Sequence, residues 1–191
     1  QFDAPIERTT VAGTGGLLTY ENADSARNFG VEIEGFMRLG RFAEPLADYF
    51  ASANISAIES KVELGSAGAT QTSRSRPLQG QSKYLANIQM GYKPEDGRWE
   101  ATALYNVAGK RIAQVGAIGL PDTFEQPFHQ LDFTARYRFA PEWSFGFRLK
   151  NILDESVEYT QGGLPTREYK PGREIGFSIE WAPDFSVPGK N

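Results

Sequence analysis

Few side chains in this chain could catalyse a reaction or hold a metal. It has one histidine, His129, and no cysteine. A histidine-centred catalytic triad, or a site with several histidine or thiolate ligands, therefore cannot be built from it. His129 alternates with Leu131 and Phe133, where we expect an interfacial strand residue. We therefore expect neither enzymatic activity nor a cofactor or bound metal.

Two other motifs could bind an ion, but each lacks the residues that binding needs. The segment "AGKRI" at 108–112 is faintly similar to a phosphate loop. It lacks the spaced glycines and a serine or threonine after Lys110. The carboxylates of Asp154, Glu155 and Glu158 could hold calcium, but the glycine spacing of a calcium loop is missing. A solvated loop is the better interpretation of this cluster.

Charged side chains instead recur at every second position of apolar segments. In "ARYRFAPEWSFGFRLKN" at 135–151, aromatic and aliphatic residues alternate with arginine, lysine, serine and glycine around a Pro141-Glu142 turn. Side chains on a strand point alternately to opposite faces, so each arm has one apolar and one polar face. The same alternation predicts an all-β, antiparallel fold of about eight strands. The other alternating segments are 29–39, 47–58, 83–93, 99–109 and 173–181, and "FDAPIER" at 2–8 could end a further strand.

The connections between these segments alternate between short and long. The turns at 40–45, 93–98 and 140–142 are short, whereas 9–27, 60–82, 109–126 and 153–167 are long and polar. A transmembrane barrel has short turns on one rim and long loops on the other. Aromatic residues also gather towards both ends, as at a lipid–water boundary. They are Tyr49, Tyr92, Trp99, Tyr137, Phe139, Trp143 and Trp181 near the short turns, and Tyr20, Tyr84, Tyr105, Tyr159 and Tyr169 towards the long loops.

A transmembrane β-barrel therefore explains more of the pattern than a soluble barrel or sandwich, which accounts for the alternation alone. The apolar face would meet lipid and the polar face a wet lumen. Mutual salt bridges are the simplest expectation for the charged residues of that wall. The net charge of −4 and pI of about 5.2 do not favour binding to nucleic acid. The expected lumen-facing charges are Glu32, Glu34, Glu100, Asp132, Arg136, Arg148 and Glu180.

Six segments resemble, in order and spacing, the C-terminal barrel of TonB-dependent outer-membrane receptors. The resemblance implies about eight C-terminal strands of a barrel with about twenty-two, formed by residues 1–181 and followed by a tail at 182–191. It also implies an N-terminal plug in the lumen. The segments are "NADSARNFGVEIEGF", "RPLQGQSKYLANIQMGYK", "LYNVAGKRI", "GLPDTFEQPFHQLDF", "LKNILDE" and "YKPGREIGFSIEW".

The same resemblance implies a location and a function. The chain would lie in the cell outer membrane, in contact with lipid. It would import a scarce ligand (a ferric siderophore, vitamin, glycan or peptide) with energy from the inner-membrane proton gradient. The expected partners are the rest of the barrel and the plug, from upstream sequence or a separate chain, and TonB through a segment absent here. The alternative is a self-contained eight-stranded barrel with an adhesive or structural anchoring role.

The last alternating segment also resembles the terminal assembly signal of outer-membrane barrels. That signal combines a polar residue, a glycine, a hydrophobic residue and a final aromatic residue. An ordinary amphipathic strand would match so loose a pattern fairly often. Family members usually stop at the aromatic residue, whereas "APDFSVPGKN" follows it here. The matching residues are Glu174, Gly176, Ile179 and Trp181.

Overall fold

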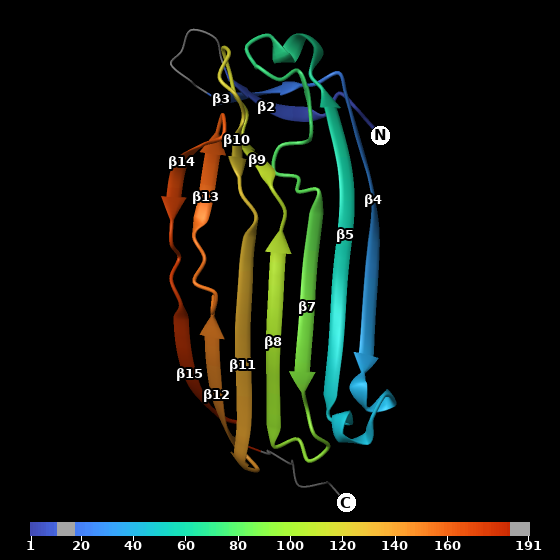
Figure 1. Ribbon diagram of the computed structural model, residues 1–191, viewed down its shortest axis with the longest axis vertical. Helices are drawn as coiled ribbons and strands as arrows, with labels where there is room; N and C mark the ends of the chain where they lie inside the picture. The colour runs from blue at the N-terminus through green and yellow to red at the C-terminus, as the bar shows by residue number, and fades with distance from the viewer. Residues whose placement is uncertain (11–17, 184–191) are drawn as a thin grey trace, which may run out of the picture.

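Seven long strands lie side by side in one antiparallel sheet (Figure 1). The computed structural model describes residues 1–10 and 18–183. Two short strands, β1 (Phe2–Asp3) and β6 (Ser75–Arg76), extend the sheet to nine strands beside β4 and β5. The predicted all-β, antiparallel fold is confirmed. The long strands are β4 (Ser25–Arg38), β5 (Tyr49–Glu63), β7 (Tyr84–Tyr92), β8 (Trp99–Ala108), β11 (Phe128–Ala140), β12 (Trp143–Lys150) and β15 (Glu174–Trp181).

Within the described residues the sheet is an open arc with two edges. β15 pairs only with β12, and the outer side of β4 is paired only by the two residues of β1. The segment 2–8, expected to end a further strand, contributes only Phe2 and Asp3 to this sheet, because Ala4 adopts a left-handed φ of 49° and the chain leaves the sheet there. Most of β4 therefore forms that edge. Residues 184–191 of the predicted tail lie outside the described residues.

The three short connections gather at one end of the sheet, as predicted (Figure 1). The β4–β5 connection contains two 3₁₀ turns, η1 (Leu39–Arg41) and η2 (Glu44–Leu46). In the β7–β8 turn, the backbone N–H of Gly97 donates to Pro94 O at 3.0 Å, and Gly97 has a φ of 60°. Such a φ favours glycine, which explains the residue at this position. Only Pro141 and Glu142 separate β11 from β12.

The long connections at the opposite end contain secondary structure that the sequence did not predict. β2 (Ile6–Thr10) pairs with β3 (Leu18–Asn22) as a hairpin. The next connection contains a 3₁₀ turn, η3 (Gly65–Gly68). The alternation did not reveal these strands, because strands of only three to six residues show little periodicity. A separate four-stranded sheet has the order β14 (Leu164–Tyr169), β13 (Val157–Gln161), β10 (Thr123–Glu125) and β9 (Arg111–Gln114).

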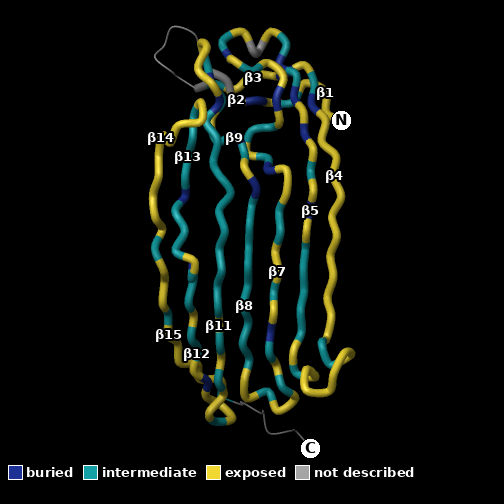
Figure 2. The backbone as a smooth tube through the Cα atoms, in the orientation of Figure 1, coloured by how far each residue is buried: buried dark blue, intermediate teal, exposed yellow. Residues whose placement is uncertain are grey.

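Little apolar surface is buried inside the described molecule. Ala23, Ala26, Val62 and Leu64 form a small core against Leu78, where β4 and β5 approach the long connections. Figure 2 shows that most of the sheet is exposed or only half-buried. Large apolar side chains are well exposed on its long strands, among them Phe29, Val31, Ile33, Ile55, Ile88, Ile175, Phe177 and Ile179. An exposed apolar surface of this extent indicates contact with another apolar medium or partner.

No helix in the described ranges is long and apolar enough to span a membrane.

Gly91 makes room for an aromatic contact on the polar face of the sheet. Gly91 lies opposite Phe50, and a Cβ at Gly91 would overlap the Phe50 ring. That ring contacts Phe36 with their centroids 5.6 Å apart. We predict that Gly91→Val lowers the free energy of unfolding by about 1–3 kcal/mol, because the added side chain displaces the ring.

A urea titration followed by tryptophan fluorescence measures this change. Gly35→Val is the matched control, because no heavy atom lies within 4 Å of a Cβ at Gly35. Equal losses of stability in the two variants would contradict the packing role of Gly91.

Candidate functional site

The register between the strands divides the long sheet into two continuous faces. Residues that lie directly opposite on neighbouring strands project to the same side. One row across five strands is entirely polar: Glu34, Asn54, Asn87, Asn106 and Gln130. The adjacent row is apolar until its last member: Ile33, Ile55, Ala86, Val107 and His129. The polar face is therefore one surface, and it is the candidate functional site.

All seven charges predicted to share a face do share it. Glu100 lies opposite Arg136, and Glu180 lies opposite Ser144 on the same side. Arg148 lies opposite Thr134, which continues the row of Thr102 from β8. Glu32, Glu34 and Asp132 occupy the equivalent alternating positions of β4 and β11. The structure thus places these side chains on one face. That this face meets a water-filled lumen remains a prediction.

Two arginines on this face are bound by carboxylates of the last strand. Arg136 Nη2 lies 2.6 Å from Glu180 Oε2, and its Nε donates to Ser144 Oγ at 2.9 Å. Arg148 Nη2 donates to Glu174 Oε1 at 2.5 Å. The side chains of both pairs are about half-exposed, so each pair contributes at most about 1 kcal/mol. These contacts agree with the expectation of mutual salt bridges on a wet wall.

Three further acidic groups of the polar face, Glu32, Glu100 and Asp132, have separate donors. Asn54 Nδ2 donates to Glu32 Oε1 at 2.5 Å, and Lys93 pairs with Glu100. Asp132 accepts hydrogen bonds from the side-chain amide of Gln130 and from the backbone N–H of Asn151. The described part of the face is therefore a polar wall whose side chains are hydrogen-bonded within and across strands.

The four residues of the predicted assembly signal all lie on the edge strand β15. Glu174 faces the polar side, where it binds Arg148, and the Arg148 guanidinium passes over Gly176 at 3.3–3.5 Å from the position of a Cβ. Ile179 and Trp181 are exposed on the apolar side. Trp181 Nε1 donates to Glu142 Oε2 at 3.2 Å. This geometry is compatible with the signal, whose recognition stays a prediction.

Aromatic residues near the short turns pack in cross-strand pairs on the apolar face. The ring centroids of Trp99 and Tyr137 lie 4.4 Å apart, and those of Tyr49 and Tyr92 lie 4.9 Å apart. Trp143 stacks on Trp181 at 6.0 Å. Such pairs add stability beyond their buried area. They form a band at this end of the sheet.

The second aromatic set is divided between the long sheet and the long connections. Tyr84 and Tyr105 lie on the long sheet, and the Tyr105 hydroxyl is 2.6 Å from His129 Nδ1. Tyr20, Tyr159 and Tyr169 instead belong to β3, β13 and β14. These three thus lie in the long connections, towards which the sequence analysis had placed the set.

A buried ion pair, which sequence reasoning missed, joins two of the long connections. Arg76 Nη2 lies 2.9 Å from Glu7 Oε2, with only 2% and 8% of the two side chains exposed. Gln71 reinforces the contact, since its Nε2 donates to the Arg8 carbonyl and its Oε1 accepts from Arg76. A buried pair of this kind fixes the β2–β3 hairpin over the 64–83 connection. No local sequence pattern predicts this ion pair, because the two residues are 69 positions apart.

The metal and catalytic candidates of the sequence do not assemble into a site. The described residues contain no group of three histidine, cysteine, aspartate or glutamate side chains that could hold a metal ion. Asp154 binds Lys170, which lowers the pKa of Asp154, whereas Glu155 accepts from the His129 backbone N–H. Lys110 of "AGKRI" lies over the Phe124 ring, 4.3 Å from its centroid. Each group thus has a structural contact.

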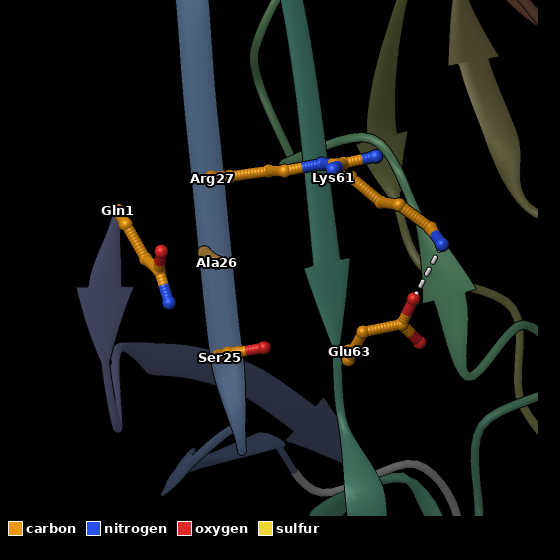
Figure 3. A pocket seen from close by; sticks show the side chains of 6 residues that line it. All are labelled: Gln1, Ser25, Ala26, Arg27, Lys61 and Glu63. Atoms are coloured by element: carbon orange, nitrogen blue, oxygen red, sulfur yellow. Dashed lines mark ion pairs between the residues drawn. The ribbon is translucent and has the colours of Figure 1, made fainter.

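Hollows occur on both faces towards the long connections. One of about 300 Å³ lies at the outer end of β4 and β5, on the apolar side of the sheet (Figure 3). There Arg27 lies opposite Lys61, and Lys61 pairs with Glu63 at 2.6 Å. A second, of about 480 Å³, lies between the β2–β3 hairpin and β9. A third, of about 430 Å³, opens where β11, β12 and β15 meet the long connections.

Comparisons with known proteins show which family this sheet resembles. The profile of the family described as TonB dependent receptor-like, beta-barrel matches residues 2–152. Among solved structures, the chain is similar to the "Copper transporter OprC", with a TM-score of 0.62 and 18% sequence identity. The match covers 94% of this chain and 27% of that chain, so the likeness concerns the fold of about a quarter of the transporter. No curated protein matches.

The buried pair of Arg76 and Glu7 should matter far more to stability than the half-exposed pairs. Glu7→Gln leaves the Arg76 charge buried without a carboxylate. We predict that this destabilises the docked hairpin by about 3–5 kcal/mol. Hydrogen exchange of the β2 and β3 amides measures the change. Glu180→Gln, the matched control on an exposed pair, should cost less than about 1 kcal/mol. Unchanged amide protection in Glu7→Gln would show that the ion pair does not hold the hairpin.

Proposed function

This chain belongs to the TonB-dependent receptor-like β-barrel family, and we propose that it forms the C-terminal part of the barrel of an outer-membrane importer. Residues 1–181 would supply the strands, and 182–191 a tail. The observation that carries the proposal is the register of apolar and polar rows across seven strands, which shifts only beyond Arg138, at the end of β11. A barrel wall in lipid needs this arrangement, with apolar residues outside and polar residues towards a lumen.

The arrangement of the connections supports the same proposal. Short turns at one end and long, structured connections at the other are typical of outer-membrane barrels. The band of aromatic pairs near the short turns suits a lipid–water interface. We therefore place the short turns in the periplasm and the long connections outside the cell.

The open edges favour a segment of a larger barrel over a self-contained one. In hydrocarbon, an unpaired row of backbone N–H and C=O groups costs several kcal/mol for each group. Within the described residues β15 does not pair with β1 or β4, as closure of a small barrel would require. We propose that both edges pair with further strands of the same barrel, from upstream sequence or another chain. The eight-stranded anchor is therefore the weaker alternative.

The transported ligand is a scarce compound in this proposal, such as a ferric siderophore, a vitamin, a glycan or a peptide. The similar solved structure is named as a copper transporter. At 18% sequence identity the similarity concerns the fold alone, so copper is not assigned to this chain. Import would draw on the inner-membrane proton gradient through TonB, which would bind a segment outside this chain. A plug would occupy the lumen beside the polar face. We propose transport without enzymatic activity.

A pair of adjacent substitutions tests which face meets lipid. Phe147→Arg places a charge among exposed apolar side chains, and we predict a loss of about 2–4 kcal/mol in the free energy of unfolding, as for charges near the bilayer midplane. Arg148→Phe, one residue along β12, removes only a half-exposed salt bridge and should be milder. Urea unfolding of the complete receptor in lipid vesicles measures both values. A larger loss in Arg148→Phe would reverse the assignment of the faces.

Surface labelling tests the orientation of the barrel. An epitope inserted at Ser66, in the long 64–83 connection, should bind antibody on intact cells. The same epitope at Asp96, in the short β7–β8 turn, should bind only after the outer membrane is opened. Labelling at Asp96 without labelling at Ser66 would show the opposite topology.

A further inference from the structure

The strand β4 is paired along its whole length on one side and almost nowhere on the other. All 14 residues of β4 lie opposite residues of β5. On the outer side only Ser25 and Ala26 have partners, which are the two residues of β1. From Arg27 to Arg38 the outer edge therefore has no partner strand among the described residues. Lipid cannot satisfy the backbone N–H and C=O groups of such an edge.

The short strand β1 has the direction and register that would cover this edge. Phe2 lies opposite Ala26, and the next residue of β1 lies opposite the preceding residue of β4. Each step back along the chain from Phe2 therefore advances one residue along β4, towards the short turns. Figure 3 shows Gln1 at the start of β1, beside β4, and Gln1 and Arg27 line the same hollow. A polypeptide that leads into Gln1 in this register would run along the unpaired edge.

The direction of the strands argues against β15 as the partner of this edge. Neighbours in the long sheet are antiparallel, and its seven long strands follow one another in chain order. The first and the last of an odd number of such strands run in the same direction, so β4 and β15 are parallel. Bacterial outer-membrane barrels have an even number of antiparallel strands. In such a barrel a further strand, antiparallel to β4, lies beside it.

The side chains of β4 indicate what that strand carries. On the apolar face Phe29, Val31 and Ile33 are 66–68% exposed. On the polar face Glu34 has no hydrogen-bond or ion-pair partner in the described part of the chain, whereas carboxylates of β15 pair with arginines of β11 and β12. Opposite and diagonal neighbours on adjacent strands stabilise each other when their side chains match. A matching strand is apolar on the first face and has a cation near Glu34 on the second.

We propose that the polypeptide preceding Gln1 in the complete receptor extends β1 along the edge of β4 in the register of Phe2 and Ala26. The sixth residue before Gln1 then lies opposite Ile33. Even positions, counted back from Gln1, are apolar and face lipid, and odd positions face the lumen. A lysine or arginine at the fifth, seventh or ninth position reaches Glu34. The inference rests on the proposed function, which treats this chain as part of a larger barrel.

The sequence of the gene upstream of the Gln1 codon tests the chemistry of the strand. We expect apolar or aromatic residues at the second, fourth and sixth positions before Gln1. We also expect a basic residue at the fifth, seventh or ninth position. Loss of the alternation, or the lack of a basic residue at all three positions, would overturn the proposal.

Cysteine cross-linking in the complete receptor, in a background without other cysteines, tests the register. Ile33→Cys is combined with a cysteine at the sixth position before Gln1, because opposed side chains on neighbouring strands lie near disulfide distance. After oxidation, mass spectrometry should show at least tenfold more disulfide than with a cysteine at the fifth or seventh position. These two positions are the matched controls, since their side chains point to the other face. A maximum at either control position, or no cross-link at all, would overturn the proposed register.

Two further measurements separate the other possible outcomes. A cross-link from Ile33→Cys to Ile175→Cys, Phe177→Cys or Ile179→Cys would show that β15 occupies the edge, which would overturn the proposal. If the double variants fail to fold, hydrogen exchange of the unaltered receptor decides. The amides of the eleven residues before Gln1, which would reach Arg38 in this register, should exchange at least tenfold more slowly than in the receptor unfolded in urea. Equal exchange rates would overturn the proposal.

This inference and the proposed function can fail separately. The cross-link does not depend on which face meets lipid or on transport, so a reversed result for Phe147→Arg and Arg148→Phe would contradict the assignment of the faces while the strand pairing stands. A missing cross-link together with the expected surface labelling at Ser66 would reject the strand pairing and leave the orientation of the barrel intact.

Discussion

A slip of one residue between any two of the seven long strands would turn every side chain of one strand to the opposite face. The observed register avoids this, so that the row from Glu34 to Gln130 stays polar across five strands. The remaining features follow from that alignment. In our account the apolar side is exposed because it faces the lipid of a membrane. The hydrogen bonds between strands pair the backbone N–H and C=O groups, which lipid cannot do.

The two ends of the sheet are stabilised by different interactions. Near the short turns, aromatic rings pair across strands on the outside, with centroids 4.4–6.5 Å apart. Near the long connections, stability depends on a small core around Val62 and Leu64 and on the buried pair of Arg76 and Glu7. In our account the first end lies at an interface with lipid, whereas the second has an interior of its own. This difference agrees with a rim that presents structured loops for recognition.

The sequence predicted the features whose signal is local. Alternation identified the long strands and placed Arg136, Arg148 and Glu180 on one face, and "PEDG" in the β7–β8 connection indicated a turn. It did not predict β9, β10, β13 or β14, because strands of three to six residues show little periodicity. The pairing of β10 with β13 also joins segments that are tens of residues apart. The cavity of about 430 Å³ was missed because Tyr169, Gly172 and Arg173 reach it from the far end of a connection.

The central claim is that one face of the sheet meets lipid and the other meets water. The chain contains no cysteine, so single cysteines introduced from Phe145 to Lys150 can each carry a spin label in the receptor in lipid vesicles. Oxygen, which concentrates in lipid, should relax the labels at 145, 147 and 149 most strongly. A water-soluble nickel complex should relax those at 146, 148 and 150. Accessibilities that rise and fall together for the two reagents, or that show no alternation, would contradict the account.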